Sequence, residues 1–263
     1  LCDIVIHSDC VDRGVTKEAS FEKMRALYAA IRRARAGYDP ALRSASGMVG
    51  GDGAKMRAYV QRGKTICGDY IGGVIAQALE MGESNACMKC IVAAPTAGSC
   101  GVLPAVLLPY QAREGLDDHT MVRAMYVAGA IGQVVAAKAS IAGAAGGCQA
   151  EIGTASAMGA AALCYLGGGD AQAVCHAAAI AIKAMLGLVC DPIAGLVEVP
   201  CVKRNAAGAV IAMSSADMAL AGIRSAVPPD EVILAMREVG DKMDVSLKET
   251  GVGGVAGTPF GQK

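Results

Sequence analysis

Three cysteines of this chain, Cys148, Cys190 and Cys201, stand where the chain must change direction. The first follows a Gly-Gly pair, the second precedes an Asp-Pro pair and the third follows a proline. Thiols at helix ends and chain breaks can converge on one point, where free backbone amides stabilise the thiolate form. Three convergent thiolates do not describe a structural zinc site, which usually has four protein ligands. They are typical of an iron–sulfur cluster in which one iron lacks a protein ligand and is free to act as a Lewis acid.

The remaining cysteines indicate packing more than chemistry. Cys164 and Cys175 fall inside helical patterns, where a thiol usually behaves as a small apolar side chain. Cys87 and Cys90 form a CxxC pair, but no second pair stands at a zinc-ribbon spacing and no strand–helix context supports a redox motif. The odd total of eleven cysteines, without a secretory signal, indicates reduced thiols. Eleven cysteines offer many triples, so spacing alone leaves the choice of ligands open.

The segments that position these cysteines have the composition of helices packed through small residues. Apolar residues make up 54% of the chain but aromatic residues only 3%, so the core must form by close approach of Ala- and Gly-rich surfaces. No alternating strand pattern of convincing length occurs. We therefore expect a mainly α fold, with residues 1–263 forming one compact multi-helix catalytic domain in which Gly-rich loops line the cluster site.

Caps and glycine stops predict the helix boundaries. Ser20 is expected to cap a first amphipathic helix over residues 20–37. Further helices are expected over about 65–81, from Asp117 or Asp118 to Ala145, and over 148–169, 170–190, 204–222 and 228–240. Two Gly-rich segments, 43–56 and the turn 95–101, are expected to be loops that present free backbone amides.

Charge and hydropathy exclude several kinds of partner. The 24 basic residues balance the 24 acidic residues, so we expect neither nucleic acid nor a membrane surface to bind. The mean hydropathy of +0.42 raises the question of a membrane span over 125–147. Because Gln133 and Lys138 lie near the middle of that Ala- and Gly-rich segment, we interpret it as a buried core helix. Because the first residues do not have the pattern of a signal peptide, we expect a cytoplasmic location.

Four segments resemble, in order, one family of enzymes: SGMVGGDGAKM (46–56), IVAAPTAGSCGVLPAVL (91–107), GCQAEIGTASAMGAAAL (147–163) and GLVCDPIAGLVEVPCVKRNAAGA (187–209). They are similar to the α chain, or C-terminal α domain, of the iron–sulfur-dependent L-serine dehydratases, and the resemblance runs from about residue 16 to the end. It implies a [4Fe-4S] cluster on Cys148, Cys190 and Cys201, the residues that the chain breaks favour, and a helical fold.

The activity that the resemblance implies is conversion of L-serine to pyruvate and ammonia without pyridoxal phosphate. The open iron would withdraw charge from the substrate hydroxyl, and a base would remove the Cα proton. Longer single-chain members end in a tail cysteine that can occupy the fourth iron, but no cysteine follows Cys201 here. The chain is therefore similar to the separate-subunit form, with a β chain as partner and/or with copies of itself.

The substrate carboxylate would need hydrogen-bond donors. The two Gly-rich loops can supply backbone amides together with Ser46, Lys55, Thr96 and Ser99. Ordinary turn chemistry accounts equally well for each of these residues taken singly. Arg204 and Asn205, close after a predicted ligand, are expected to tune the cluster or orient the substrate, although a helix start explains them too.

The sequence does not identify the base. His176 lies in an apolar helical pattern, His119 at an acidic helix start and His7 near the N-terminus, and none has a visible partner. In the family that the chain resembles, the second subunit or domain contributes a serine- and histidine-bearing substrate segment, so the resemblance implies that the base lies on the partner chain. Two other functions stay open: a cluster-dependent L-cysteine desulfidase on the same scaffold, and a non-enzymatic helical membrane or scaffold protein with incidental thiols.

Overall fold

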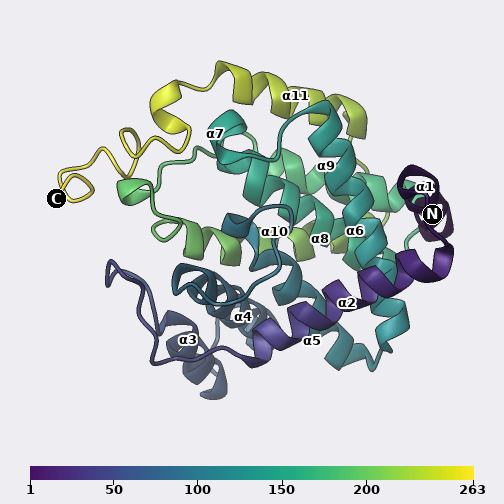
Figure 1. The fold of residues 1–263 in the computed structure, drawn as a ribbon, viewed down its shortest axis with the longest axis horizontal. Coiled ribbons are helices and arrows are strands. Elements are labelled where there is room, and N and C mark those ends of the chain that lie inside the picture. The colour runs from purple at the N-terminus through teal and green to yellow at the C-terminus, as the bar shows by residue number, and fades with distance from the viewer.

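The computed structural model describes residues 1–263, and all of its regular structure is helical (Figure 1). The α-helices are α1 (Cys2–Arg13), α2 (Lys17–Ala36), α3 (Asp52–Gln61), α4 (Gly68–Ala86), α5 (Val102–Glu114), α6 (Asp118–Lys138), α7 (Gly143–Gly146), α8 (Thr154–Leu166), α9 (Ala171–Met185), α10 (Cys201–Leu220) and α11 (Pro229–Lys242). Short helical segments join them: η1 (Ala97–Ser99), η2 (Gln149–Gly153), η3 (Ile193–Gly195) and η4 (Val245–Leu247). The expected mainly α fold is confirmed.

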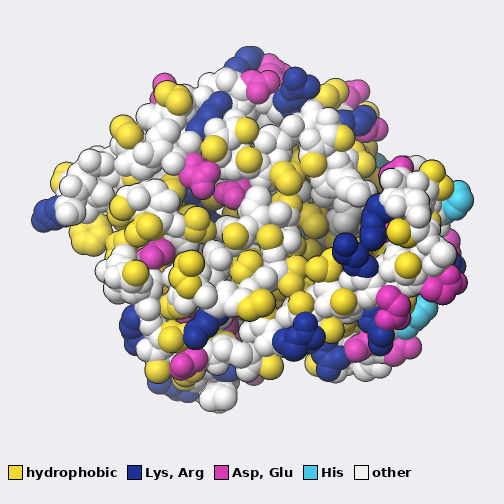
Figure 2. Space-filling model, in the orientation of Figure 1, with side chains coloured by type: hydrophobic (Ala, Val, Ile, Leu, Met, Phe, Trp, Pro, Cys, Tyr) yellow, Lys and Arg dark blue, Asp and Glu magenta, His cyan; other side chains and the backbone are white.

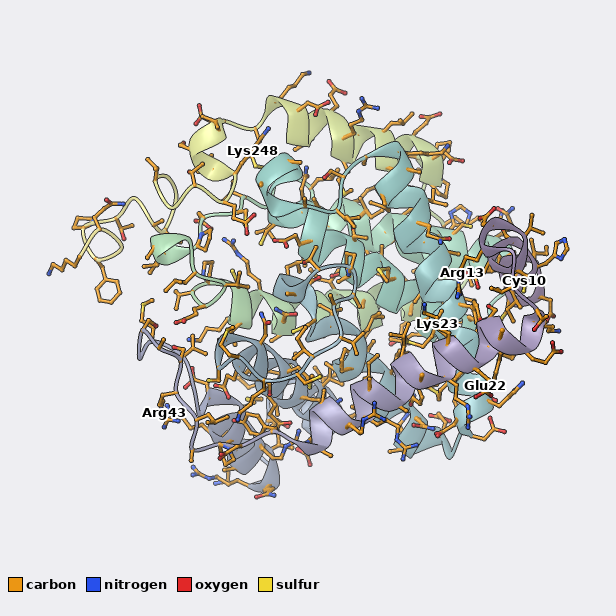
Figure 3. All side chains as sticks on the ribbon, in the orientation of Figure 1. Cys10, Arg13, Glu22, Lys23, Arg43 and Lys248 are labelled. Atoms are coloured by element: carbon orange, nitrogen blue, oxygen red, sulfur yellow. The ribbon has the colours of Figure 1, made fainter.

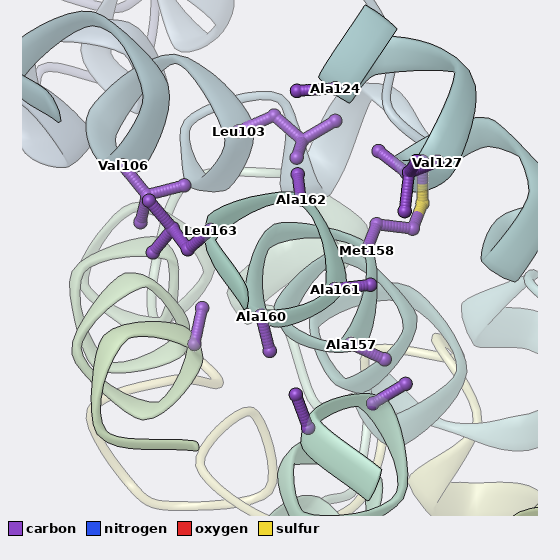
Figure 4. Packing of buried hydrophobic residues seen from close by; sticks show 14 of the residues in the cluster. Leu103, Val106, Ala124, Val127, Ala157, Met158, Ala160, Ala161, Ala162 and Leu163 are labelled. Carbon is purple, nitrogen blue, oxygen red and sulfur yellow. The ribbon is translucent and has the colours of Figure 1, made fainter. Parts of the chain in front are cut away.

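Helix α8 runs through the middle of the molecule, where α5, α6, α9 and α10 pack around it (Figure 1). Eleven of its 13 residues are buried, so it has no polar face and depends on small side chains to admit its neighbours. Figure 4 shows alanines such as Ala160 and Ala162 pointing to different sides of this helix. The core that includes α8 contains 39 buried residues, with members in every α-helix except α3 and α7, as the small-residue composition predicts.

The contact between α8 and α10 is close because a glycine lies in it. A Cβ atom on Gly208 of α10 would lie 2.7 Å from the Ile152 side chain and 2.9 Å from the Ser156 hydroxyl. Atoms cannot approach so closely without displacement of the helix. This contact fixes the start of α10 against the segment that precedes α8, and both carry predicted cluster ligands.

The expected start of the first long helix was wrong by a few residues. Helix α2 begins at Lys17, and the Thr16 hydroxyl accepts a hydrogen bond from the Ala19 amide (3.2 Å). Ser20 is buried inside the helix, where its hydroxyl bonds the Tyr126 hydroxyl of α6 (2.6 Å). The local pattern allows either residue as the cap, and the packing of α2 on α6 selects Thr16.

Helix α6 ends at Lys138 and not at Ala145, because the chain breaks over residues 139–142 before the short α7. This is the one helix long and apolar enough to cross a membrane by length and composition, and half of its most apolar window is buried in the protein. It packs on α1, α2 and α8, which agrees with its interpretation as a core helix. On the face drawn in Figure 2, basic and acidic side chains are interspersed.

The C-terminal residues 245–263 form a series of turns that project from one side of the molecule (Figure 1). They contact the segment 187–201, which we call the cysteine clip. The Cys190 amide donates to the Leu247 carbonyl (2.8 Å), and the Glu249 amide donates to the Cys190 carbonyl (2.6 Å). The tail therefore holds one predicted cluster ligand in place through its backbone.

Candidate metal and active site

Three core helices bring the predicted ligands together. Cys148 lies just before η2, which leads into α8; Cys190 follows the end of α9; and Cys201 is the first residue of α10. All three side chains are buried, with at most 5% of each residue exposed. Ile152 and Met185 pack against the first two thiols, so the site has an apolar wall.

Cys148, Cys190 and a carboxylate, Glu151, form a group that can hold a metal ion. Their ligand atoms all lie within 4.8 Å of one another. Small residues make room for them: a Cβ atom on Gly143 would lie 2.9 Å from the Cys190 sulfur and 2.7 Å from the Glu151 Oε2. Cys201 lies outside this tight group, yet close enough to Cys148 for the two charges to interact.

The thiols of the site differ in their readiness to ionise. A hydrogen bond from Cys190 lowers the pKa of Cys148, and the Arg204 guanidinium acts in the same direction against the effect of burial. The same hydrogen bond, together with burial, raises the pKa of Cys190. Burial raises the pKa of Cys201 to about 12. One thiolate is therefore favoured beside a cation, while the other two ionise only when a metal stabilises them.

Glu151 was not among the residues that the sequence singled out for the site. Its Oε1 accepts a hydrogen bond from the Thr96 hydroxyl (2.7 Å), which comes from the second Gly-rich turn. Burial raises the pKa of Glu151, and the bond from Thr96 opposes that effect. The available signal was its spacing, since a residue three positions after Cys148 lies one helical turn away.

Arg204 joins the cysteine clip to α10. Its guanidinium donates to the Val189 carbonyl (2.8 Å) and forms an ion pair with the buried Asp191 (2.8 Å). Asp191 in turn accepts the backbone amide of Val255 in the C-terminal tail (2.7 Å). Arg204 thus lies at the site and connects α10 to the cysteine clip and, through Asp191, to the C-terminal tail. The sequence also allowed a role at the helix start alone, but these contacts go further than that.

Asn205 joins the second Gly-rich turn to the same helix. Its side-chain nitrogen donates to the carbonyls of Gly98 (2.7 Å) and Cys201 (3.0 Å), and its oxygen accepts from the Gly101 amide (2.9 Å). All of its polar atoms are therefore used in fixing the turn. Asn205 contacts the backbone of a predicted ligand and orients the loop that carries Thr96.

The other predicted substrate residues differ in burial and in the groups they contact. Ser99 is fully buried, and its hydroxyl contacts the Thr96 hydroxyl (3.2 Å), which extends a chain of polar groups to Glu151. Ser46, on the first Gly-rich loop, donates its hydroxyl to Glu198 of the cysteine clip. Lys55 lies on the surface of α3 with 76% of its side chain exposed, where it pairs with Asp52 (2.9 Å).

The histidines do not belong to the site formed by Cys148, Glu151, Cys190 and Cys201. His176 accepts a hydrogen bond from the Ser225 amide at its Nδ1 (3.3 Å) and lines a cavity of about 440 Å³. The turn 167–170 and the end of α10 complete that cavity, which is therefore at the ends of α9 and α10 opposite to the cysteines. His7 and His119 are exposed. No histidine of this chain is part of the cysteine site.

Comparison with known proteins assigns the family. Residues 2–256 match the family described as serine dehydratase alpha chain. The chain belongs to this family. It is 47% identical over 267 residues to a probable L-serine dehydratase, alpha chain, of Bacillus subtilis, covering all of this chain and 88% of that protein. It is 50% identical over 216 residues to the L-serine dehydratase, alpha chain, of Peptoniphilus asaccharolyticus, covering 82% and 74% of the two chains.

Longer proteins also match this chain over part of their length. The L-serine dehydratase TdcG of Escherichia coli is 45% identical over 183 residues, which are 68% of this chain but only 40% of that protein. L-serine dehydratases of Streptomyces coelicolor and Mycobacterium tuberculosis match over the same shares, at 45% and 47% identity. These proteins thus combine an alpha-chain region with a larger additional part in one chain.

Proposed function

We propose that this chain is the α subunit of an L-serine dehydratase, a lyase that converts L-serine to pyruvate and ammonia and uses a [4Fe-4S] cluster held by Cys148, Cys190 and Cys201. The observation that carries the proposal is the convergence of three buried thiols at the ends of α8, α9 and α10, in a chain of this family. The names of the relatives supply the substrate.

The donor set fits a cluster better than a single zinc ion. Zinc takes all of its ligands at about 2.0–2.3 Å, so its donors crowd together. Here Cys201 lies outside the close group of Cys148, Glu151 and Cys190. A cluster takes each thiolate on a different iron, so it suits the wider spacing. Three thiols also leave one iron of a four-iron cluster without a protein ligand, as a Lewis-acid role requires.

When bound, the cluster would supply an electron-withdrawing iron that helps the substrate hydroxyl to leave as water. The chain's own residues orient the reactants around it. Thr96 fixes Oε1 of Glu151 by a 2.7 Å hydrogen bond, so this carboxyl group presents a defined face to the site. Arg204 places a positive charge beside the Cys148 thiolate and stabilises it. Loss of the Cα proton and of the hydroxyl group from serine, together one molecule of water, leaves aminoacrylate, which takes up water to give pyruvate and ammonia.

The two Gly-rich loops are proposed to hold the substrate carboxylate. Thr96 and Ser99 belong to a turn that Asn205 ties to the first turn of α10. Ser46 belongs to a loop that Glu198 ties to the cysteine clip. Lys55, which is exposed and paired with Asp52, retains its proposed substrate role only if the substrate reaches α3.

Anaerobic purification followed by spectroscopy and activity measurements tests the proposal. We expect a broad absorbance band near roughly 400 nm from thiolate-to-iron charge transfer, and pyruvate formation from L-serine. Colourless protein without iron would contradict the cluster. Turnover of L-cysteine with none of L-serine would show a desulfidase and contradict the substrate assignment. L-threonine, assayed in parallel, defines the specificity for the hydroxy amino acid.

The partner and the compartment are further parts of the proposal. The relatives named alpha chain imply a β chain, with which this chain would form a heteromer. All eleven cysteines are free, which suits a reducing compartment such as the cytoplasm.

A further inference from the structure

Glu198 is a buried carboxylate that no cation neutralises. It lies in the cysteine clip between Cys190 and Cys201, and only 6% of the residue is exposed. Its Oε2 accepts hydrogen bonds from the hydroxyls of Ser44 (2.9 Å) and Ser46. A buried carboxylate is costly unless hydrogen bonds replace its lost water. Glu198 therefore depends on these two serines, and they belong to the first Gly-rich loop, about 150 positions earlier in the chain.

The same two hydroxyls organise the backbone of that loop, which spans residues 43–51. The Ser44 hydroxyl accepts from the Val49 amide (3.2 Å), and the Ser46 hydroxyl accepts from the Met48 amide (3.1 Å). Each serine thus passes a hydrogen bond from a loop amide to Glu198. Removal of the carboxylate would release both chains of hydrogen bonds at once.

A second buried carboxylate anchors the far end of the loop. Glu83 of α4 accepts from the amides of Asp52 (2.6 Å) and Gly53 (3.2 Å) at the start of α3. Between the two anchors lie Gly50 and Gly51, whose amides donate to no group of the protein. Both have positive φ (138° and 79°), and a side chain on Gly50 would collide with the loop backbone. The loop is thus fixed on both sides of two unused donors.

We propose that Glu198 is a positioning residue, which holds the first Gly-rich loop against the cysteine clip so that the Gly50 and Gly51 amides receive the substrate carboxylate. This inference rests on the proposed function, because it assumes that the substrate binds beside Cys190 and Cys201. Successive backbone N–H groups in a turn can form an anion-binding concavity, and Gly50 and Gly51 supply two such groups at the end of this loop. Glu198 acts only through the loop and does not itself touch the substrate.

Steady-state kinetics of Glu198→Ala and Glu198→Gln test the inference. The alanine variant is expected to raise KM for L-serine by at least about tenfold, the equivalent of about 1.4 kcal/mol of lost substrate binding, with a smaller change in kcat. The glutamine variant keeps an oxygen that accepts both serine hydroxyls, so its KM should stay within about threefold of the native value. Iron content and the band near roughly 400 nm should match those of the native protein in both variants.

Trypsin provides a readout that does not depend on turnover. Arg43 is exposed at the base of the loop, on the edge of the molecule (Figure 3). Cleavage after Arg43, followed by mass spectrometry, should be faster in Glu198→Ala, and L-serine should slow it in the native protein but not in this variant. Glu231→Ala on α11, which changes an exposed carboxylate far from the loop in sequence, is the control and should behave as the native protein.

The outcomes separate the two proposals. Native KM and native cleavage in Glu198→Ala would overturn the positioning role, whatever the reaction. A different result is that the native protein neither binds iron nor consumes L-serine while Glu198→Ala is still cleaved faster than it. That result would support the anchoring of the loop by Glu198 but refute its link to substrate binding. If Glu198→Ala does not fold, Ser46→Ala removes one of the two hydroxyl donors from an exposed position and should give a smaller rise in KM. An unchanged KM in that variant would also overturn the role.

Discussion

Replacing Cys148, Cys190 or Cys201 by alanine is expected to remove the bound iron and the absorbance band near roughly 400 nm. Each thiol is buried and belongs to the convergent set, so its loss removes one of the three proposed cluster ligands. Cys87→Ala and Cys90→Ala are matched controls, because these thiols lie at and after the end of α4 and are more exposed. Iron analysis of anaerobically purified variants decides: loss of iron in a CxxC variant would reassign the ligands.

Thr96→Val is expected to lower kcat/KM for L-serine by about tenfold, because it removes the hydrogen bond that orients Glu151. A hydrogen bond to a charged group contributes about 1.5–3 kcal/mol, and the variant leaves that carboxyl buried with one partner fewer. Thr96→Ser keeps the hydroxyl and should retain most of the activity. Equal kinetics for the valine and serine variants would exclude an orienting role for this bond.

The chain breaks and the family resemblance favoured the cysteines of the candidate site, whereas nothing in the sequence singled out its carboxylates. The positions of Cys148, Cys190 and Cys201 follow from local chain breaks, which glycine and proline mark in the sequence. The roles of Glu151 and Glu198 depend on hydroxyls 55 and more than 150 positions away. Contacts over such separations leave no local pattern, so only the folded arrangement reveals them.

At the level of helices, the helical nature of the elements was predictable, but their number and several of their ends were not, and α1, α3 and α7 were not expected. The segment 43–56 was expected to be one loop, but α3 begins inside it at Asp52. Its first amides bond to Glu83, a residue of the next helix, and that contact substitutes for a local cap. Tertiary contacts likewise chose Thr16 over Ser20 at the start of α2. Local capping rules therefore fail where a distant side chain satisfies the helix end.

Two glycines inside helices allow the effect of close packing on stability to be measured separately from the effect of helix propensity. Gly208→Ala is expected to destabilise the protein by about 1–3 kcal/mol, because its Cβ would collide with Ile152 and Ser156 of the central segment. Gly73→Ala in α4 is the matched control, since a Cβ there meets no atom within 4 Å, and it should stabilise by about 0.5–1 kcal/mol. Urea unfolding of both variants measures the difference. Stabilisation by Gly208→Ala would mean that α8 and α10 are less closely packed than described.

At the level of the whole molecule, the position of the histidines bears on the need for a partner. The chain contains only three histidines, and none belongs to the site of Cys148, Cys190 and Cys201. They lie on α1, on α6 and in the half of α9 that is remote from Cys190. The longer relatives carry most of their length outside the region that this chain matches. The group that removes the Cα proton is therefore expected to come from the partner chain.

This arrangement predicts that the isolated chain binds the cluster but turns over L-serine slowly or not at all, and that added β chain restores activity. The three proposed cluster ligands lie in this chain, so the band near roughly 400 nm should be present without the partner and should change little when it binds. When β chain is titrated into the isolated chain, the rate of pyruvate formation should rise and reach a plateau at a fixed ratio of the two chains. Full activity of the isolated chain would instead place the base within this chain. Glu151, the buried carboxyl group of the site, would then be the first residue to replace.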